Sequence, residues 1–199
     1  MPSESDKPDQ KAALRNRLLA EREALGEIQR RRMGQQICGH LLRFLDDRDC
    51  LGIAAYHAFR GEPDLMPALE ALHHAGRRIF LPVIASNRRM HFHRWRPGGP
   101  LAKNRFGIPE PVGTRACDVS SLELVLMPLV AFSVAGARLG MGAGFYDQAL
   151  EFRLESPSSG PLLVGAAYGL QEVDNLPVQS WDVPLDAVIT DRGLKTFRE

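Results

Sequence analysis

The chain has 199 residues, with 25 Lys or Arg against 24 Asp or Glu and a formal net charge of +1. Hydrophobic residues make up 44% and charged residues 25%, which is typical of folded globular proteins and excludes an intrinsically disordered chain. No apolar run reaches the ~18 residues that a membrane-spanning helix needs. The balanced charge also argues against a general nucleic-acid-binding protein, since such proteins usually carry a basic excess.

The cysteines and the N-terminus indicate the compartment. The chain has three cysteines, Cys38, Cys50 and Cys117, and none of them forms a C-x-x-C pair. An odd number without paired spacing fits a reducing compartment and argues against structural zinc. Residues 1–11 are polar and lack the apolar segment of a signal peptide. We therefore expect a cytoplasmic protein with one domain over residues 1–199, of which residues 1–8 are flexible.

The order of the predicted elements indicates the fold class. Apolar residues at helical spacing predict helices over 9–25 and 27–45, separated by Gly26, with Asp6 as a possible cap of the first helix. Further along the chain we expect strands over 51–56, 79–84, 90–95, 122–127, 162–168 and 187–190, helices over 63–75 and 146–154, and loops over 97–112 and 131–144. Strands that alternate with helices predict an α/β fold, with a largely parallel sheet flanked by helices.

A glycine-rich segment carries the most chemical information. It runs Arg138-Leu-Gly-Met-Gly-Ala-Gly-Phe-Tyr-Asp147, between a predicted strand and a predicted helix. Glycines let a ligand approach the backbone closely, and successive N–H groups in such a turn can converge on an anion. The segment is neither a Walker A loop nor a dinucleotide fingerprint, and its spacing alone leaves a purely structural turn equally open. Arg138 and Asp147 at its two ends favour a metal-bound polyphosphate.

The longer segment AFSVAGARLGMGAGFYD, residues 131–147, resembles the signature of the 5-formyltetrahydrofolate cyclo-ligase family. That signature reads approximately P-x-x-A-F-D-x-x-G-x-R-L-G-x-G-x-G-[YF]-Y-D. Other segments agree in order and spacing, and they are Lys11-Ala-Ala-Leu-Arg15, Glu62, and Leu176-Pro177 through Asp182 and Asp186 to Thr190. The resemblance extends over roughly residues 11–193.

The resemblance implies an enzyme that uses ATP and Mg²⁺ to convert 5-formyltetrahydrofolate to 5,10-methenyltetrahydrofolate, releasing ADP and phosphate. In this reaction the formyl oxygen attacks the γ-phosphate of ATP, and N10 of the folate closes the ring. The protein has to position its substrates and neutralise phosphate charge. The implied partners are therefore small molecules, without nucleic acid or membrane, and the implied state is a monomer.

The resemblance also assigns roles to residues. Arg138 and Tyr146 are the expected catalytic residues, and Asp147 and Asp182 the expected Mg²⁺ ligands. The expected nucleotide contacts are Lys11, Arg15, Arg138, Leu139, Gly140, Met141, Gly142, Ala143, Gly144, Phe145 and Tyr146. The expected folate contacts are His57, Glu62, Met141, Gly142, Ala143, Gly144 and Phe145.

Simpler interpretations stay open for several of these residues. Lys11 and Arg15, four residues apart on one helix face, are also typical of a solvated basic surface. Glu62 and Asp182 also suit turns, and His57 a strand end. One of Phe145 and Tyr146 is expected to pack in the core.

Three positions depart from the family pattern. Ser133 replaces an aspartate that is expected to be structural, Ala143 replaces Gly or Lys, and Gln148 replaces a cation. If residue 143 requires a positive φ, alanine there costs roughly 1 kcal/mol. These departures motivate an alternative, a folate- or nucleotide-binding protein on the same fold with weakened catalysis. A sugar-phosphate isomerase or transferase is a further alternative, although no paired general acid and base is evident.

Overall fold

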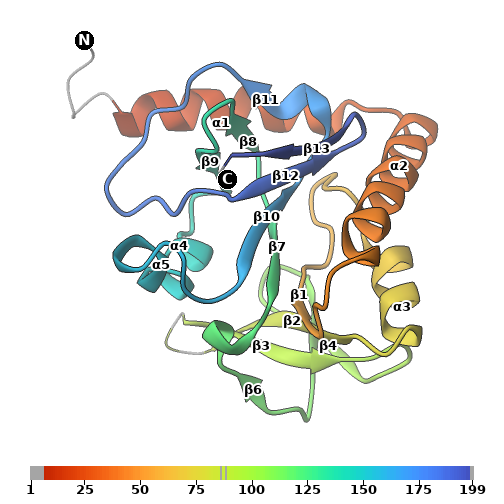
Figure 1. Ribbon diagram of the computed structural model, residues 1–199. Coiled ribbons are helices and arrows are strands. Elements are labelled where there is room, and N and C mark those ends of the chain that lie inside the picture. Colours follow the sequence, from red (N-terminus) through yellow and green to blue (C-terminus); the bar gives the residue numbers. More distant parts are fainter. Residues whose placement is uncertain (1–6, 86, 88, 198–199) are drawn as a thin grey trace.

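The computed structural model describes residues 7–85, 87 and 89–197, and its centre is an eight-stranded sheet (Figure 1). The strand order is β13-β12-β10-β7-β1-β2-β3-β6. The strands are β1 (Gly52–Ala54), β2 (Arg78–Ile84), β3 (Met90–Trp95), β6 (Ala116–Cys117), β7 (Leu124–Pro128), β10 (Leu162–Ala166), β12 (Ala187–Thr190) and β13 (Gly193–Thr196). Neighbouring strands from β12 to β2 are parallel, and the remaining pairs toward the edges are antiparallel. The predicted α/β class with a largely parallel sheet is confirmed.

Apolar side chains on both faces of the sheet explain its layers. In β7, Leu124 and Leu126 pack in one core cluster, whereas Val125 and Met127 pack in another on the opposite face. The first cluster is covered by α2 (Glu27–Asp46) and α3 (Met66–His74), the second partly by α4 (Phe145–Ala149) and α5 (Phe152–Glu155). Figure 1 shows these helix pairs on opposite sides of the sheet.

The helix α1 (Lys7–Glu23) packs elsewhere, against a small second sheet. This sheet contains β8 (Ala131–Ser133), β9 (Arg138–Leu139) and β11 (Glu172–Val173). Leu18 and Leu19 of α1 form a third core cluster with Val130, Ala131 and Leu139. The helix therefore lies beside the strand that leads into the glycine-rich segment (Figure 1).

Several predicted loops contain strands. Residues 97–112 form a hairpin of β4 (Leu101–Lys103) and β5 (Pro109–Pro111), and residues 131–144 contain β8 and β9. These strands were missed because they are only two or three residues long and carry no extended apolar pattern. The predicted helix over 146–154 is divided into α4 and α5, and β6, β11 and β13 were not predicted.

The remaining expectations concern the chain ends and the membrane. The proposed cap Asp6 and most of the segment predicted to be flexible lie outside the described residues, whereas Lys7 and Pro8 begin α1. Among the described helices, none combines the length and apolar character that crossing a membrane requires.

Close packing around Gly165 in β10 gives a stability test. A Cβ atom there would lie 2.7 Å from Leu129 Cδ2 and 2.9 Å from Leu185 Cδ1. We expect Gly165→Ala to lower the free energy of unfolding by about 1–3 kcal/mol, because it over-packs the core. As a control, Gly34→Ala in α2 places its Cβ in open space. It should raise that free energy by roughly 0.5–1 kcal/mol, since alanine favours helix. Urea denaturation measures both, and an unchanged midpoint for Gly165→Ala would contradict the tight contact.

Candidate functional site

A cavity of about 720 Å³ opens at the carboxyl ends of the parallel strands, where α/β proteins commonly bind ligands. Its walls come from α1, the segment after β1, the ends of β2 and β3, the β4–β5 hairpin, the glycine-rich segment and the segment before β12. Every predicted site residue lines it: Lys11, Arg15, His57, Glu62, Arg138, Leu139, Gly140, Met141, Gly142, Ala143, Gly144, Phe145, Tyr146, Asp147 and Asp182. The fold thus brings together residues that lie far apart in the sequence.

The glycine-rich segment forms a turn between β9 and α4. Gly142 and Gly144 have φ values of 97° and 71°, in the region that favours glycine. Ala143 has no positive φ, because Arg60 is the only non-glycine residue with a positive φ in the described chain. The strain considered for Ala143 is therefore absent. Since α4 has only five residues, positive charge for an anion has to come from neighbouring side chains.

Arg15 of α1 supplies one of these charges. Its Nε donates to the carbonyl oxygen of Gly140 at 2.8 Å, and a Cβ on Gly142 would lie 3.3 Å from its Cζ. Partial burial lowers the pKa of this guanidinium from its ordinary value. The contact ties α1 to the turn and explains why a small residue suits position 142.

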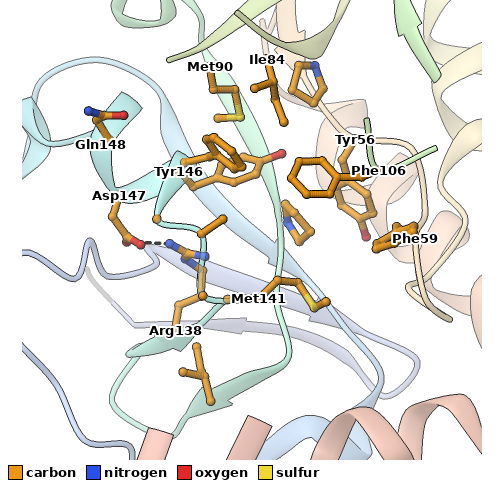
Figure 2. Close-up of a pocket in the computed structure, with 18 of the residues that line it drawn as sticks. Tyr56, Phe59, Ile84, Met90, Phe106, Arg138, Met141, Tyr146, Asp147 and Gln148 are labelled. Atoms are coloured by element: carbon orange, nitrogen blue, oxygen red, sulfur yellow. Dashed lines mark hydrogen bonds and ion pairs between the residues drawn. The ribbon is translucent and has the colours of Figure 1, made fainter. Parts of the chain in front are cut away.

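Two ion pairs join the other predicted cations to the predicted metal ligands. Arg138 Nη2 donates to Asp147 Oδ1 at 2.7 Å, and Lys11 Nζ pairs with Asp182 Oδ2. Lys11 is buried, so a solvated surface is the wrong interpretation for this residue. Figure 2 shows the pair of Arg138 and Asp147 at one side of the cavity.

The two carboxylates lie near each other and suit a hard cation. Asp147 Oδ1 also accepts from the backbone N–H of Val183, the residue next to Asp182, at 3.2 Å. No group of three or more His, Cys, Asp or Glu that could hold a metal occurs in the described part of the chain. Mg²⁺ does not require one, because one or two carboxylates plus substrate phosphates commonly hold it. The residues present therefore fit Mg²⁺ bound together with a polyphosphate.

The opposite side of the cavity is largely aromatic. Figure 2 shows Tyr56, Phe59 and Phe106 on this side, across from Arg138, with Tyr146 between. The rings of Phe106 and Phe145 meet edge to face, with centroids 6.4 Å apart. Sequence reasoning missed Phe106 because it lies in the segment expected to be a loop, at the tip of the β4–β5 hairpin. The turn-forming Asn104 was its only signal, and Asn104 Oδ1 accepts from the N–H of Phe106 at 2.8 Å.

Glu62 provides the carboxylate on this side. Its Oε2 accepts from the N–H of Phe59 at 3.0 Å, and its Oε1 lies 3.9 Å from Nη2 of Arg22. Burial raises the pKa of Glu62 to about 7, although Arg22 and the N–H of Phe59 oppose the shift. The carboxylate is therefore close to its titration midpoint at neutral pH.

Three buried polar atoms in the cavity wall lack a hydrogen-bond partner among the described residues: His57 Nε2, Arg138 Nε and Tyr146 Oη. Burial lowers the pKa of His57 and raises that of Tyr146, so both side chains favour their neutral forms. Buried polar groups are normally paired, and an unpaired group costs about 1–3 kcal/mol. The cavity is thus prepared for a polar ligand.

Two residues of the segments that resemble the family, Ser133 and Asp186, stabilise the fold and do not line the cavity. Ser133 Oγ accepts from the N–H groups of Ala135 and Ala137 at 3.3 and 3.1 Å, so it stabilises the β8–β9 turn as the expected aspartate would. Asp186 forms a buried ion pair with Arg153 at 2.9 Å, away from the cavity.

The raised pKa of Glu62 predicts a pH dependence of stability. A folded-state pKa of about 7, above the unfolded value of 4.5, means that the folded protein binds the proton more tightly. This stabilising contribution is complete below pH 4.5 and is lost as the pH rises through 7. Relative to Glu62→Gln, the wild-type free energy of unfolding should therefore fall by on the order of 3 kcal/mol over this range. Denaturation curves at several pH values measure it. The control Glu70→Gln, at an exposed position, should keep the pH dependence of the wild type. If the free energy of unfolding of Glu62→Gln varies with pH in parallel with that of the wild type, the assignment is contradicted.

The chain matches the model of the 5-formyltetrahydrofolate cyclo-ligase family over residues 7–191. It is 38% identical to the 5-formyltetrahydrofolate cyclo-ligase of Escherichia coli (strain K12) over 173 residues, which cover 85% of this chain and 93% of that protein. It is 36% identical to the Haemophilus influenzae enzyme of the same name over 165 residues, covering 81% and 87% of the two chains.

A solved structure from the same family has a similar fold. The 5,10-methenyltetrahydrofolate synthetase of Aquifex aeolicus superposes with a TM-score of 0.82 at 30% identity, covering 95% of this chain and 93% of that one. Family members use ATP to convert 5-formyltetrahydrofolate to 5,10-methenyltetrahydrofolate. The match over nearly the whole described chain, together with the site geometry, places this protein in the 5-formyltetrahydrofolate cyclo-ligase family.

Proposed function

We propose that this chain is an active 5-formyltetrahydrofolate cyclo-ligase that binds both substrates in the single cavity described above. The observation that carries the proposal is the division of that cavity. One side presents Lys11, Arg15 and Arg138 with two carboxylates, and the other presents aromatic rings with Glu62. The charged side therefore complements a polyphosphate, and the aromatic side complements a flat folate ring. Both sides belong to one cavity, so the two ligands would bind close to each other.

The nucleotide belongs to the charged side. Lys11, Arg15 and Arg138 donate to the phosphates, and the turn from Gly140 to Gly144 lets them approach the backbone. Asp147 and Asp182 are the residues that would hold Mg²⁺, which neutralises phosphate charge when bound. Since these carboxylates pair with Arg138 and Lys11 in the structure, we infer that nucleotide binding redirects the cations toward phosphate.

The folate belongs to the aromatic side. In its ionised form the Glu62 carboxylate accepts hydrogen bonds from the N–H-rich edge of the pterin, and His57 offers an unpaired ring nitrogen. Phe106 and Phe145 flank the cavity with rings that suit contact with a flat ligand. This arrangement directs the formyl group toward Tyr146 and Arg138.

The reaction then needs positioning more than a protein nucleophile. The formyl oxygen attacks the γ-phosphorus, a new O–P bond forms, and the bond to ADP breaks. N10 attacks the formyl carbon, its proton is released, and inorganic phosphate leaves with the former formyl oxygen. The Arg138 guanidinium stabilises the developing phosphate charge, and Tyr146 Oη donates a hydrogen bond at the reacting oxygen.

The alternative of a catalytically weakened binding protein loses most of its support. Ser133 makes the turn contacts expected of the aspartate it replaces, and Ala143 has no positive φ. Gln148 still leaves the cavity without one cation. We further propose that the chain acts as a cytoplasmic single-domain monomer on small-molecule substrates.

The direct test supplies purified protein with 5-formyltetrahydrofolate and MgATP and follows the absorbance band of the methenyl product. We expect product only when ATP is present. Binding is followed in parallel by tryptophan fluorescence, because Trp181 lines the cavity while Trp95 is buried in the core. Ligand-induced fluorescence changes without product would support the weakened binding protein instead.

The metal assignment is tested with Asp147→Asn, which retains an oxygen acceptor for Arg138 and for the N–H of Val183. Alanine is less suitable because it would leave the buried Arg138 unpaired. We expect the Mg²⁺ concentration for half-maximal rate to rise at least about tenfold, since even an outer-shell partner matters this much for metal affinity. The control Glu151→Gln, an exposed carboxylate at the same cavity, should leave it unchanged. An unaltered Mg²⁺ dependence of Asp147→Asn would exclude Asp147 as a ligand.

A further inference from the structure

Arg22, in the last turn of α1, is fully buried although it is absent from the cavity wall. Its Nε donates to the carbonyl oxygen of Arg60 at 3.1 Å, and its Nη1 to that of Leu129 at 2.9 Å. Its Nη2 contacts the carbonyl oxygen of Phe59 at 3.5 Å and faces Glu62 Oε1 at 3.9 Å. One side chain thus bridges the segments that follow β1 and β7.

The segment after β1 needs such support. Arg60 has a φ of 51° and Gly61 a φ of 77°, so a non-glycine residue is held in the left-handed region. On its outer side, Arg60 Nε pairs with Glu23 Oε1 at 2.6 Å. Consecutive residues of α1 therefore hold this turn, Arg22 through carbonyl oxygens and Glu23 through a side chain.

The turn ends at Glu62, whose carboxylate does line the cavity. We propose that Arg22 is a positioning residue for the reduced-folate substrate, acting through Glu62 by fixing the turn of residues 59–62 and by placing a positive charge beside its carboxylate. The inference rests on the proposed function, because it takes Glu62 as the group that binds the pterin. Arg22 itself touches no substrate in this arrangement, which distinguishes it from the residues of the cavity wall.

The charge around Glu62 supports this role. The groups that face its carboxylate are Arg22 from α1, Tyr56 from the segment after β1, Tyr146 from α4 and the N–H of Phe59. Of these four groups, Arg22 is the positively charged one. Its charge opposes the desolvation that raises the pKa of Glu62. Without Arg22 the carboxyl group of Glu62 would stay protonated to higher pH. The pterin would then lose a hydrogen-bond acceptor.

Arg22 can be replaced without leaving every partner unsatisfied. The carbonyl oxygen of Leu129 also accepts from Gln171 Nε2 at 2.9 Å. Arg22→Lys keeps a buried cation but loses the planar fork that reaches three carbonyl oxygens at once. We therefore choose Arg22→Lys as the main variant and Arg22→Met as the stronger one.

The test compares these variants with the wild type by steady-state kinetics from pH 6 to pH 9 and by calorimetric binding of 5-formyltetrahydrofolate. We expect Arg22→Met to raise the KM and the Kd for 5-formyltetrahydrofolate at least about tenfold, as for loss of a contact to a charged group. The KM for ATP should stay within about twofold, and the acid limb of kcat/KM for the folate should move to higher pH. Arg22→Lys should lie between the wild type and Arg22→Met. The control Arg17→Met removes an exposed cation of the same helix and should change none of these values.

A double-mutant cycle separates positioning from general stability. If Arg22 acts through Glu62, Arg22→Lys should weaken folate binding in the wild type but add little in a Glu62→Gln background. Additive effects, equal increases in the KM for both substrates, or an unchanged folate Kd would overturn the inference. Should the wild type bind folate without forming product, the proposed function fails while calorimetry still tests Arg22.

Discussion

Burial of the Arg22 guanidinium is the constraint on which the arrangement of this site depends. A buried cation is costly unless polar groups surround it, and here the carbonyl oxygens of Phe59, Arg60 and Leu129 converge on it. These carbonyls belong to segments that follow neighbouring parallel strands, β1 and β7. Because the charge must be satisfied, the end of α1 and both segments have to hold one relative position.

The same helix defines the two sides of the cavity. Lys11, in its first half, contacts Asp182, and Arg15, at its midpoint, contacts Gly140. Arg22 lies at its end beside Glu62. A single rigid element therefore sets the separation between the proposed phosphate-binding and folate-binding groups. For a reaction in which one substrate attacks the other, this separation determines whether the reacting atoms can meet.

Charge neutralisation within the cavity follows a common pattern. Each proposed phosphate-binding cation that is deeply buried, Lys11 and Arg138, pairs with a proposed metal ligand. Such pairs keep the buried charges compensated before substrate arrives, and a metal-bound polyphosphate offers both partners a replacement of the opposite sign. Burial raises the pKa of Glu62 to about 7, because Arg22 at 3.9 Å only partly compensates the desolvation of the carboxylate.

The sequence by itself determined the alternation of helices and strands, because apolar periodicity is a local property that survives in short windows. It also determined the glycine-rich segment, since Arg138 and Asp147 are only nine residues apart and act across one turn. The tertiary structure alone decided the burial of Arg22, the strands of the β4–β5 hairpin and the placement of Phe106 over the cavity. Arg22 contacts Leu129 across 107 residues of chain, and a pattern of neighbouring residues cannot specify which distant carbonyls will surround a charge.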